Sequence, residues 1–87
     1  MWAVVVNVKV NDTAEAIAGL EEVVAEVRQA PGFVAGYWIQ LEDGLGTSIA
    51  VFDATEEQVR AGMPQPGSSA RGVTMTSVQI GEVLAHA

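Results

Sequence analysis

Residues 2–10 alternate strictly between two kinds of side chain. One side of this segment is wholly apolar and consists of Trp2, Val4, Val6, Val8 and Val10, while the other consists of Ala3, Val5, Asn7 and Lys9. A period of two is typical of a β-strand, whose successive side chains point to opposite faces of a sheet. The segment therefore predicts a strand with one strongly apolar face, and the rest of the chain has to cover that face.

A helix is predicted directly after this strand. Asp12, followed three residues later by Glu15, resembles the capping box that starts a helix. Apolar side chains then recur at three- and four-residue spacing, at Ile17, Leu20, Val24 and Val27. Because this spacing places them on one side of a helix, we expect an amphipathic helix that ends before Pro31-Gly32.

Two further strands follow the first helix. Phe33–Glu42 and Thr47–Asp53 are both rich in strand-forming residues. Between them, Asp43-Gly44 and Gly46 are residues that tolerate the positive φ angles of a tight hairpin. We therefore expect these two strands to be adjacent and antiparallel.

A short helix, a loop and a last strand complete the chain. Thr55 and Gln58 form a second capping-box pair, and the helix that they open weakens at Gly62 and Pro64. Residues 63–72 have no apolar period and contain prolines, glycines and a serine pair, which is typical of a loop. The segment from Val73 to about Leu84 is predicted to form the final strand, with a bulge at Gly81.

The order strand, helix, strand, strand, helix, strand predicts an α+β fold of the ferredoxin-like βαββαβ class. Such a fold has a four-stranded antiparallel sheet with both helices on one face. Right-handed crossovers place the first and third strands at the centre of the sheet. With 87 residues and no linker or repeat, residues 1–87 are expected to form a single domain.

Alternation along the strands assigns side chains to the two faces of the sheet. The face covered by helices is predicted to hold Val4, Val6, Val8, Phe33, Tyr37, Ile39, Ile49, Val51, Val78 and Ile80. The open face is then predicted to hold Val5, Asn7, Lys9, Val34, Trp38, Gln40, Ser48, Ala50, Phe52, Val73, Met75, Ser77 and Gln79. This second set mixes large apolar side chains with amides and hydroxyls.

The apolar members of the predicted open face need a cover. Leaving a large apolar side chain in water forfeits about 1.5 kcal/mol or more of burial free energy. A second copy of the same sheet is the simplest cover, since most soluble oligomers are symmetric dimers. The amides and hydroxyls need hydrogen-bond partners, so we expect a homodimer with a partly polar cavity between the two sheet faces.

The whole pattern resembles the dimeric α/β barrel superfamily, and within it the antibiotic biosynthesis monooxygenase family. The resemblance lies in Asn7 on the first strand, in Pro31-Gly32-Phe33 with Gly36-Tyr37-Trp38, and in the run from Ile49 to Glu57. It covers roughly residues 2–60 and the last strand.

This resemblance implies a homodimer whose sheets form a barrel, and ligands held either between each sheet and its helices or inside the barrel. The family includes cofactor-independent oxygenases of phenolic polyketides, quinol oxygenases and haem-degrading enzymes. The haem-degrading members carry a His and a Trp on the second helix, and residues 55–72 contain neither. No cofactor is therefore expected.

These residues are compatible with three different functions. The first is a cofactor-independent monooxygenase acting on a phenol or quinol, which the resemblance implies. The second is a non-catalytic module that binds a small ligand or assembles through its sheet, favoured by the absence of an embedded general base. The third, a regulatory amino-acid-binding domain of the same topology, is disfavoured because Asn11-Asp12-Thr13 stands where such domains carry a glycine-rich turn.

Asn7 is the candidate catalytic residue, because its amide can donate a hydrogen bond to a substrate carbonyl or to the anion formed from it. A structural amide bonded to a neighbouring strand is the competing interpretation. Candidate ligand-binding residues are Trp38, Gln40, Phe52 and Met75, with Trp38 able to stack on a small aromatic ligand. Packing between two sheets is the alternative role for Trp38.

His86 and Arg71 are further candidates for site residues. His86 is the one side chain whose ordinary pKa lies near neutrality, but it is next to the last residue, where chains fray. Arg71 lies in the predicted loop, where it either closes over an anionic ligand or stays solvated. A single His and scattered carboxylates predict no metal site.

Charge and cysteine content exclude several classes of function. Eleven acidic residues against four scattered basic ones give a net charge of −7, which disfavours nucleic acids and anionic membrane surfaces as partners. The absence of Cys excludes disulfides, thiolate metal sites and Cys nucleophiles. No apolar run has the length of a membrane span or the flanks of a signal peptide, so a cytoplasmic location is expected.

Overall fold

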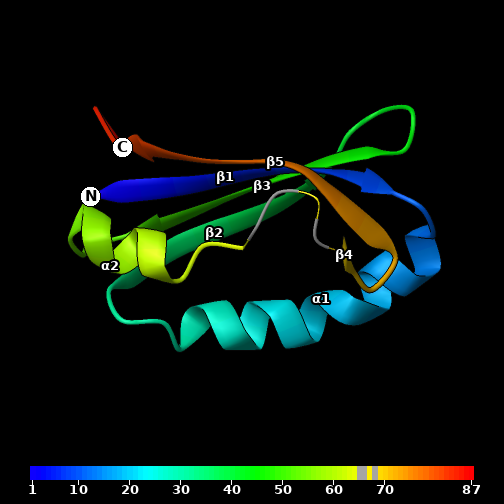
Figure 1. The fold of residues 1–87 in the computed structure, drawn as a ribbon, viewed down its shortest axis with the longest axis horizontal. Helices are drawn as coiled ribbons and strands as arrows, with labels where there is room; N and C mark the ends of the chain where they lie inside the picture. The colour runs from blue at the N-terminus through cyan, green and yellow to red at the C-terminus, as the bar shows by residue number, and fades with distance from the viewer. Residues whose placement is uncertain (65–66, 68) are drawn as a thin grey trace.

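The elements follow the predicted order in the computed structural model, which describes residues 1–64, 67 and 69–87. The strands are β1 (Trp2–Val10), β2 (Phe33–Gln40), β3 (Leu45–Phe52), β4 (Ser69–Ala70) and β5 (Val73–Glu82). Helices α1 (Thr13–Arg28) and α2 (Glu56–Ala61) lie on one side of the sheet, with α1 running beneath it and α2 near the end where the chain begins (Figure 1). This arrangement confirms the ferredoxin-like α+β fold.

The sheet is antiparallel and has the strand order β2-β3-β1-β5-β4. The prediction that the first and third strands are central is therefore confirmed. Strand β4 corrects the prediction of an unbroken loop over residues 63–72, because Ser69 and Ala70 pair with Thr74 and Val73. Gly72, at φ +77°, makes the turn between these strands, while residues 65, 66 and 68 lie outside the described residues.

The strand register corrects the predicted faces of β2 and β3. Val6, a buried residue on the helix side, is paired with Ser48, and Ser48 is paired with Trp38. Residues paired in this way share a face. The residues on the helix side of these strands are therefore Trp38, Gln40, Gly46, Ser48, Ala50 and Phe52. Those that face away are Ala35, Tyr37, Ile39, Leu45, Thr47, Ile49 and Val51.

Two irregularities explain why simple alternation fails. The register of β2 shifts between Phe33 and Ala35, so Phe33 lies on the helix side while Ala35 lies on the open side. A second shift in β5 leaves Thr76 as the extra residue, and its hydroxyl donates to the backbone oxygen of Asn7 at 3.0 Å. This bulge puts Met75 on the helix side, and the predicted bulge at Gly81 is wrong because Gly81 pairs regularly with Ala3.

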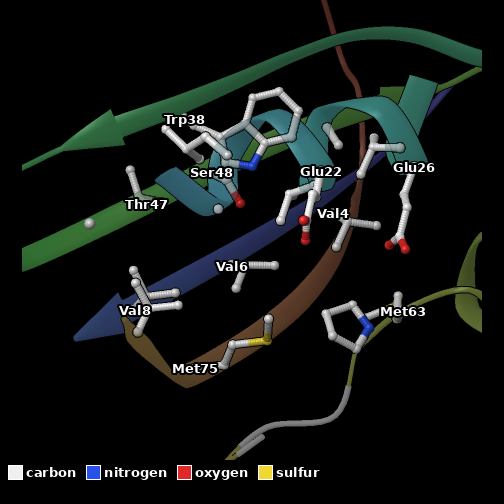
Figure 2. Close-up of a pocket in the computed structure, with 18 of the residues that line it drawn as sticks. Val4, Val6, Val8, Glu22, Glu26, Trp38, Thr47, Ser48, Met63 and Met75 are labelled. Atoms are coloured by element: carbon white, nitrogen blue, oxygen red, sulfur yellow. The ribbon is translucent and has the colours of Figure 1, made fainter. Parts of the chain in front are cut away.

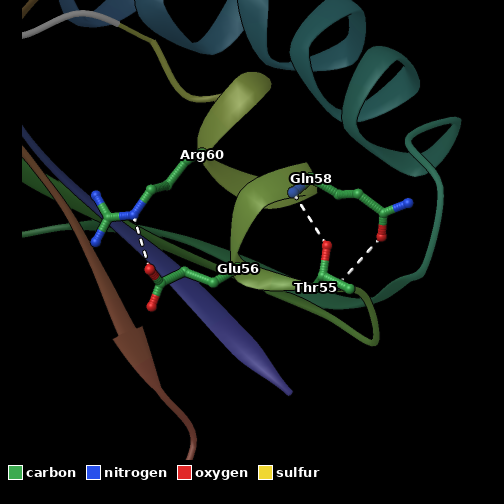
Figure 3. A network of polar contacts seen from close by, with 4 residues as sticks. All are labelled: Thr55, Glu56, Gln58 and Arg60. Atoms are coloured by element: carbon green, nitrogen blue, oxygen red, sulfur yellow. Dashed lines mark hydrogen bonds and ion pairs between the residues drawn. The ribbon is translucent and has the colours of Figure 1, made fainter.

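The predicted turn and capping residues lie at the ends of the helices and strands. Asp43 and Gly44 have positive φ in the β2–β3 hairpin, whereas Gly46 lies within β3. At α2 both bonds of the capping box form, from the Gln58 backbone N–H to the Thr55 hydroxyl at 3.2 Å and from the Thr55 backbone N–H to the Gln58 amide oxygen at 3.1 Å (Figure 3). The prediction of a second short helix is confirmed.

At α1 only half of the predicted capping box is present. The carboxylate of Asp12 accepts a hydrogen bond from the backbone N–H of Glu15 at 3.0 Å. The carboxylate of Glu15 instead accepts a bond from Arg71, which fixes the β4–β5 turn against the start of the helix. Within the described residues, no helix is long and apolar enough to cross a membrane.

Candidate functional site

A cavity of about 1000 Å³ lies between the helix-side face of the sheet and the two helices. Its sheet wall comes from the alternate valines of β1 and from the facing residues of β2, β3 and β5. Its other walls come from α1 and from the segment that contains α2. Figure 2 shows Val4, Val6 and Val8 along one side, with Trp38, Met63 and Met75 placed around them.

Small side chains on β3 create this space. Gly46, Ser48 and Ala50 face the helices, whereas the larger Ile49 and Val51 of the same strand face away. As a result few side chains are deeply buried among the described residues, and the hydrophobic core consists of Val4, Val6 and Val59, each 7–8% exposed, with partly buried neighbours. The fold therefore keeps a hollow where a domain of this size usually has packed side chains.

Trp38 lies flat along its own strand. A Cβ atom added to Gly36 would be 2.8 Å from the Trp38 ring, so only a glycine leaves room for the indole in this position. Ser48 is directly across from Trp38 in the register, and the two side chains lie next to each other at the cavity (Figure 2). Among the described residues neither the indole N–H nor the Ser48 hydroxyl makes a hydrogen bond, so both are available to a ligand.

Three charged side chains line the cavity, and these are Glu22, Glu26 and Arg71. The Nε atom of Arg71 donates to Oε2 of Glu15 at 2.6 Å. This hydrogen bond, together with the charge of Glu15 and more weakly that of Glu22, raises the pKa of Arg71 above its usual value. The guanidinium therefore stays charged and tied to α1.

The β4–β5 turn holds the first part of α1 in place. The backbone oxygen of Gly72 accepts hydrogen bonds from the N–H groups of Asn11 and Asp12 at 2.8 and 3.2 Å. A Cβ atom at Gly72 would lie 2.6 Å from the backbone nitrogen of Ala16, so no larger residue fits this contact. Farther along α1, Gly19 packs against the side chain of Arg71.

The structure brings four of the five predicted site residues together. Trp38, Gln40, Phe52 and Met75 all line the cavity, on the helix side of the sheet and not on the open face where they were expected. Asn7 lies on the opposite face, where its side-chain amide donates to the hydroxyl of Ser77 at 2.8 Å. This bond is the one expected for the structural interpretation of Asn7.

Sequence reasoning did not select Ser48, Glu22 or Glu26 as site residues. Ser48 was placed on the predicted open face among many other residues, and its proximity to Trp38 depends on the strand register. Glu22 immediately precedes Val23, and Glu26 immediately precedes Val27. Both acidic residues therefore flank the side of the helix that faces the sheet. The sequence feature that could have identified them is a pair of acidic residues, four positions apart, beside the apolar stripe of the helix.

The two remaining candidate residues, Arg71 and His86, lie far apart in the fold. Arg71 reaches the cavity, whereas His86 lies in the segment beyond the end of β5 and is exposed. The part of the chain that the structure describes has no group of three or more His, Cys, Asp or Glu side chains that could hold a metal ion. No family model, curated protein or solved structure matches this chain.

Proposed function

We propose that this protein binds a small, largely apolar molecule in the cavity between α1 and the sheet. The observation that carries the proposal is the cavity itself, which has about 1000 Å³ of space and a mainly apolar lining. Small-molecule sites are typically clefts of roughly 300–1,000 Å³, lined by hydrophobic side chains with a few placed polar groups. The cavity has this composition, with Trp38 and Ser48 as the polar groups on the sheet side.

The energetics of the cavity support a ligand. The cavity is open to solvent beside α1, so water can enter it. Covering apolar surface contributes about 25 cal/mol per Å², so an apolar molecule that covers these walls is favoured over that water. Water is poorly held by walls of valine, methionine and phenylalanine, whereas an apolar molecule gains from contact with them.

Binding is proposed ahead of oxygenation because of the position of Asn7. The resemblance to the antibiotic biosynthesis monooxygenase family implies that the strand-one Asn contacts the substrate. Here Asn7 faces away from the cavity and is bonded to Ser77. Oxygen uptake with a panel of quinols and anthrones separates the two functions, with Asn7→Ala and Trp38→Phe as control variants. We expect no turnover, and turnover that is lost in either variant would establish the enzyme.

We also propose that a second copy of the chain covers the open face. Val5, Ile49, Val51, Tyr37 and Ile39 form an apolar surface there, and Tyr37 is 62% exposed in the single chain. Among the strand residues of this face only Lys9 is charged, although the chain carries eleven acidic residues. Two such faces can therefore meet without repulsion between carboxylates.

A neutral fluorescent probe tests the binding proposal. N-phenyl-1-naphthylamine fluoresces weakly in water and strongly in apolar surroundings, so we expect saturable enhancement on adding the protein. Ala50→Leu places three more carbons on the helix side of β3, inside the cavity, and should weaken binding of the probe. Ala18→Leu adds the same atoms on an exposed position of α1 that does not line the cavity, and should bind normally. Equal binding by both variants would place the probe elsewhere.

A further inference from the structure

Glu22 and Glu26 lie four residues apart on α1, and both line the cavity. Figure 2 shows their carboxylates extending from the helix toward the space below it. Both residues are also exposed to solvent, so they mark the place where the cavity opens beside α1. A ligand held among the valines of β1 thus has two carboxylates at its exit.

This position is unfavourable for two negative charges. Like charges four residues apart on a helix repel each other. Both residues lie in the second half of α1, toward the end where the helix dipole is negative. By contrast, Glu15 lies in the first turn, where the dipole favours an acidic side chain, and it has Arg71 as a partner.

No cation of the chain forms an ion pair with either carboxylate among the described residues. Arg71 is bonded to Glu15 and interacts only weakly with Glu22, and Arg60 is bonded to Glu56. Lys9 lies on the other face of the sheet, and Arg28, in the last turn of α1, makes no ion pair among the described residues. Neither Glu22 nor Glu26 makes an ion pair or a side-chain hydrogen bond in the part of the chain that the structure describes. The net charge of −7 adds a negative potential around the opening.

We infer that the cavity selects an amphiphile with a cationic amine or quaternary ammonium group, held by Glu22 and Glu26 while the apolar body fills the space below α1. This inference rests on the proposed binding function and names the class of ligand. The cation relieves the repulsion between the carboxylates and stays partly in water, which limits its desolvation cost. An anionic amphiphile of the same shape meets the opposite field and binds more weakly.

Three probes that share one apolar chain test this inference. Decyltrimethylammonium, decanol and decanoate are compared by displacement of N-phenyl-1-naphthylamine from the wild-type protein. The two ionic compounds are kept below their micelle-forming concentrations and decanol below its solubility limit. We expect the ammonium compound to displace the probe at an about tenfold lower concentration than decanoate, with decanol between them, since partly exposed ion pairs contribute modestly. The difference should shrink in high salt.

Variants assign this preference to the two carboxylates. Glu22→Gln combined with Glu26→Gln should bring the ammonium compound close to decanol, with decanol binding unchanged. Glu21→Gln combined with Glu57→Gln removes the same net charge from exposed positions that do not line the cavity, and should keep the preference.

The outcomes separate this inference from the proposed function. If neither the fluorescent probe nor any decyl compound binds, the binding function itself is wrong. If decanol binds and decanoate binds as tightly as the ammonium compound, the cavity binds apolar molecules but the charge selectivity is wrong. A preference for ammonium that survives in the Glu22 and Glu26 double variant also overturns the role given to these residues.

Discussion

Asn7 and Trp38 lie on opposite faces of the sheet. Asn7 is paired with Thr47, and Trp38 is paired with Ser48, the next residue of the same strand. Because neighbouring residues of a strand point to opposite faces, the Trp38 indole lies at the cavity and the Asn7 amide lies on the open face. The two residues therefore belong to different surfaces, Trp38 to the proposed ligand site and Asn7 to the proposed dimer face.

Gly36 is predicted to control ligand affinity through Trp38. In Gly36→Ala the added methyl carbon would lie 2.8 Å from the indole ring, which has to move. We expect the affinity for N-phenyl-1-naphthylamine to fall about three- to tenfold, as for the loss of one aromatic contact. Gly81→Ala is the matched control, since nothing lies within 4 Å of its added carbon. Equal affinities in a fluorescence titration would refute the role of the indole.

The open face is predicted to mediate dimerisation. Ile49→Glu places a carboxylate in the middle of this apolar surface, where a partner sheet would bury it at a high desolvation cost. Sedimentation velocity should show a dimer for the wild type and a monomer for this variant. Ala25→Glu introduces the same charge on an exposed position of α1 and should remain dimeric. A monomeric wild-type protein at micromolar concentration contradicts the proposal.

The Arg71–Glu15 pair is predicted to stabilise the attachment of α1 in a salt-dependent way. The hydrogen bond to Glu15 raises the pKa of Arg71 in the folded protein. The ion pair therefore stabilises the fold fully at every pH below the ordinary pKa of Arg, and its contribution is lost only at still higher pH. The loss of stability in Arg71→Gln should therefore be constant from about pH 7 to about pH 10 and decrease in about 1 M salt. Urea denaturation at several pH values and salt concentrations measures it. A strong change between neutral pH and pH 10 is incompatible with this account.

The capping box of α2 is predicted to maintain one end of the cavity. Thr55→Ala removes the hydroxyl that accepts from Gln58, at a cost of about 0.5–2 kcal/mol in the free energy of unfolding. Thr55→Ser keeps the hydroxyl and should lose little. Since α2 carries Val59 into the core, thermal melts of both variants followed by circular dichroism report on this end of the fold. Equal melting temperatures would mean that the cap is dispensable.

The strand order and the ends of the helices could be predicted from the sequence because they depend on local signals. The alternation of residues 2–10, the Thr55–Gln58 box and the Asp43-Gly44 turn each act over a few residues. The faces of β2 could not be predicted, because this strand carries apolar side chains on both sides. The choice is made by pairing with β3 and by a register shift near Phe33, which are long-range features.

The cavity escaped prediction for a related reason. We assumed that the larger side chains of β3 fill the core, and so assigned Ile49 and Val51 to the helix side. In the structure the small residues of this strand, Gly46, Ser48 and Ala50, face the helices, and the cavity occupies the volume that larger side chains would fill. An assignment that places the largest side chains in the core therefore fails for a strand whose small residues line a cavity.

Methyl NMR spectroscopy of β1 tests the central claim most directly, because alternate valines of this strand report on opposite faces of the sheet. Val4, Val6 and Val8 line the cavity, whereas Val5 lies between them on the open face with Ile49 as its partner. On titration with N-phenyl-1-naphthylamine, we expect the methyl signals of the three cavity valines to shift while those of Val5 and Ile49 stay in place. Shifts confined to Val5 and Ile49, or no shifts at saturating probe, would contradict a ligand site between α1 and the sheet.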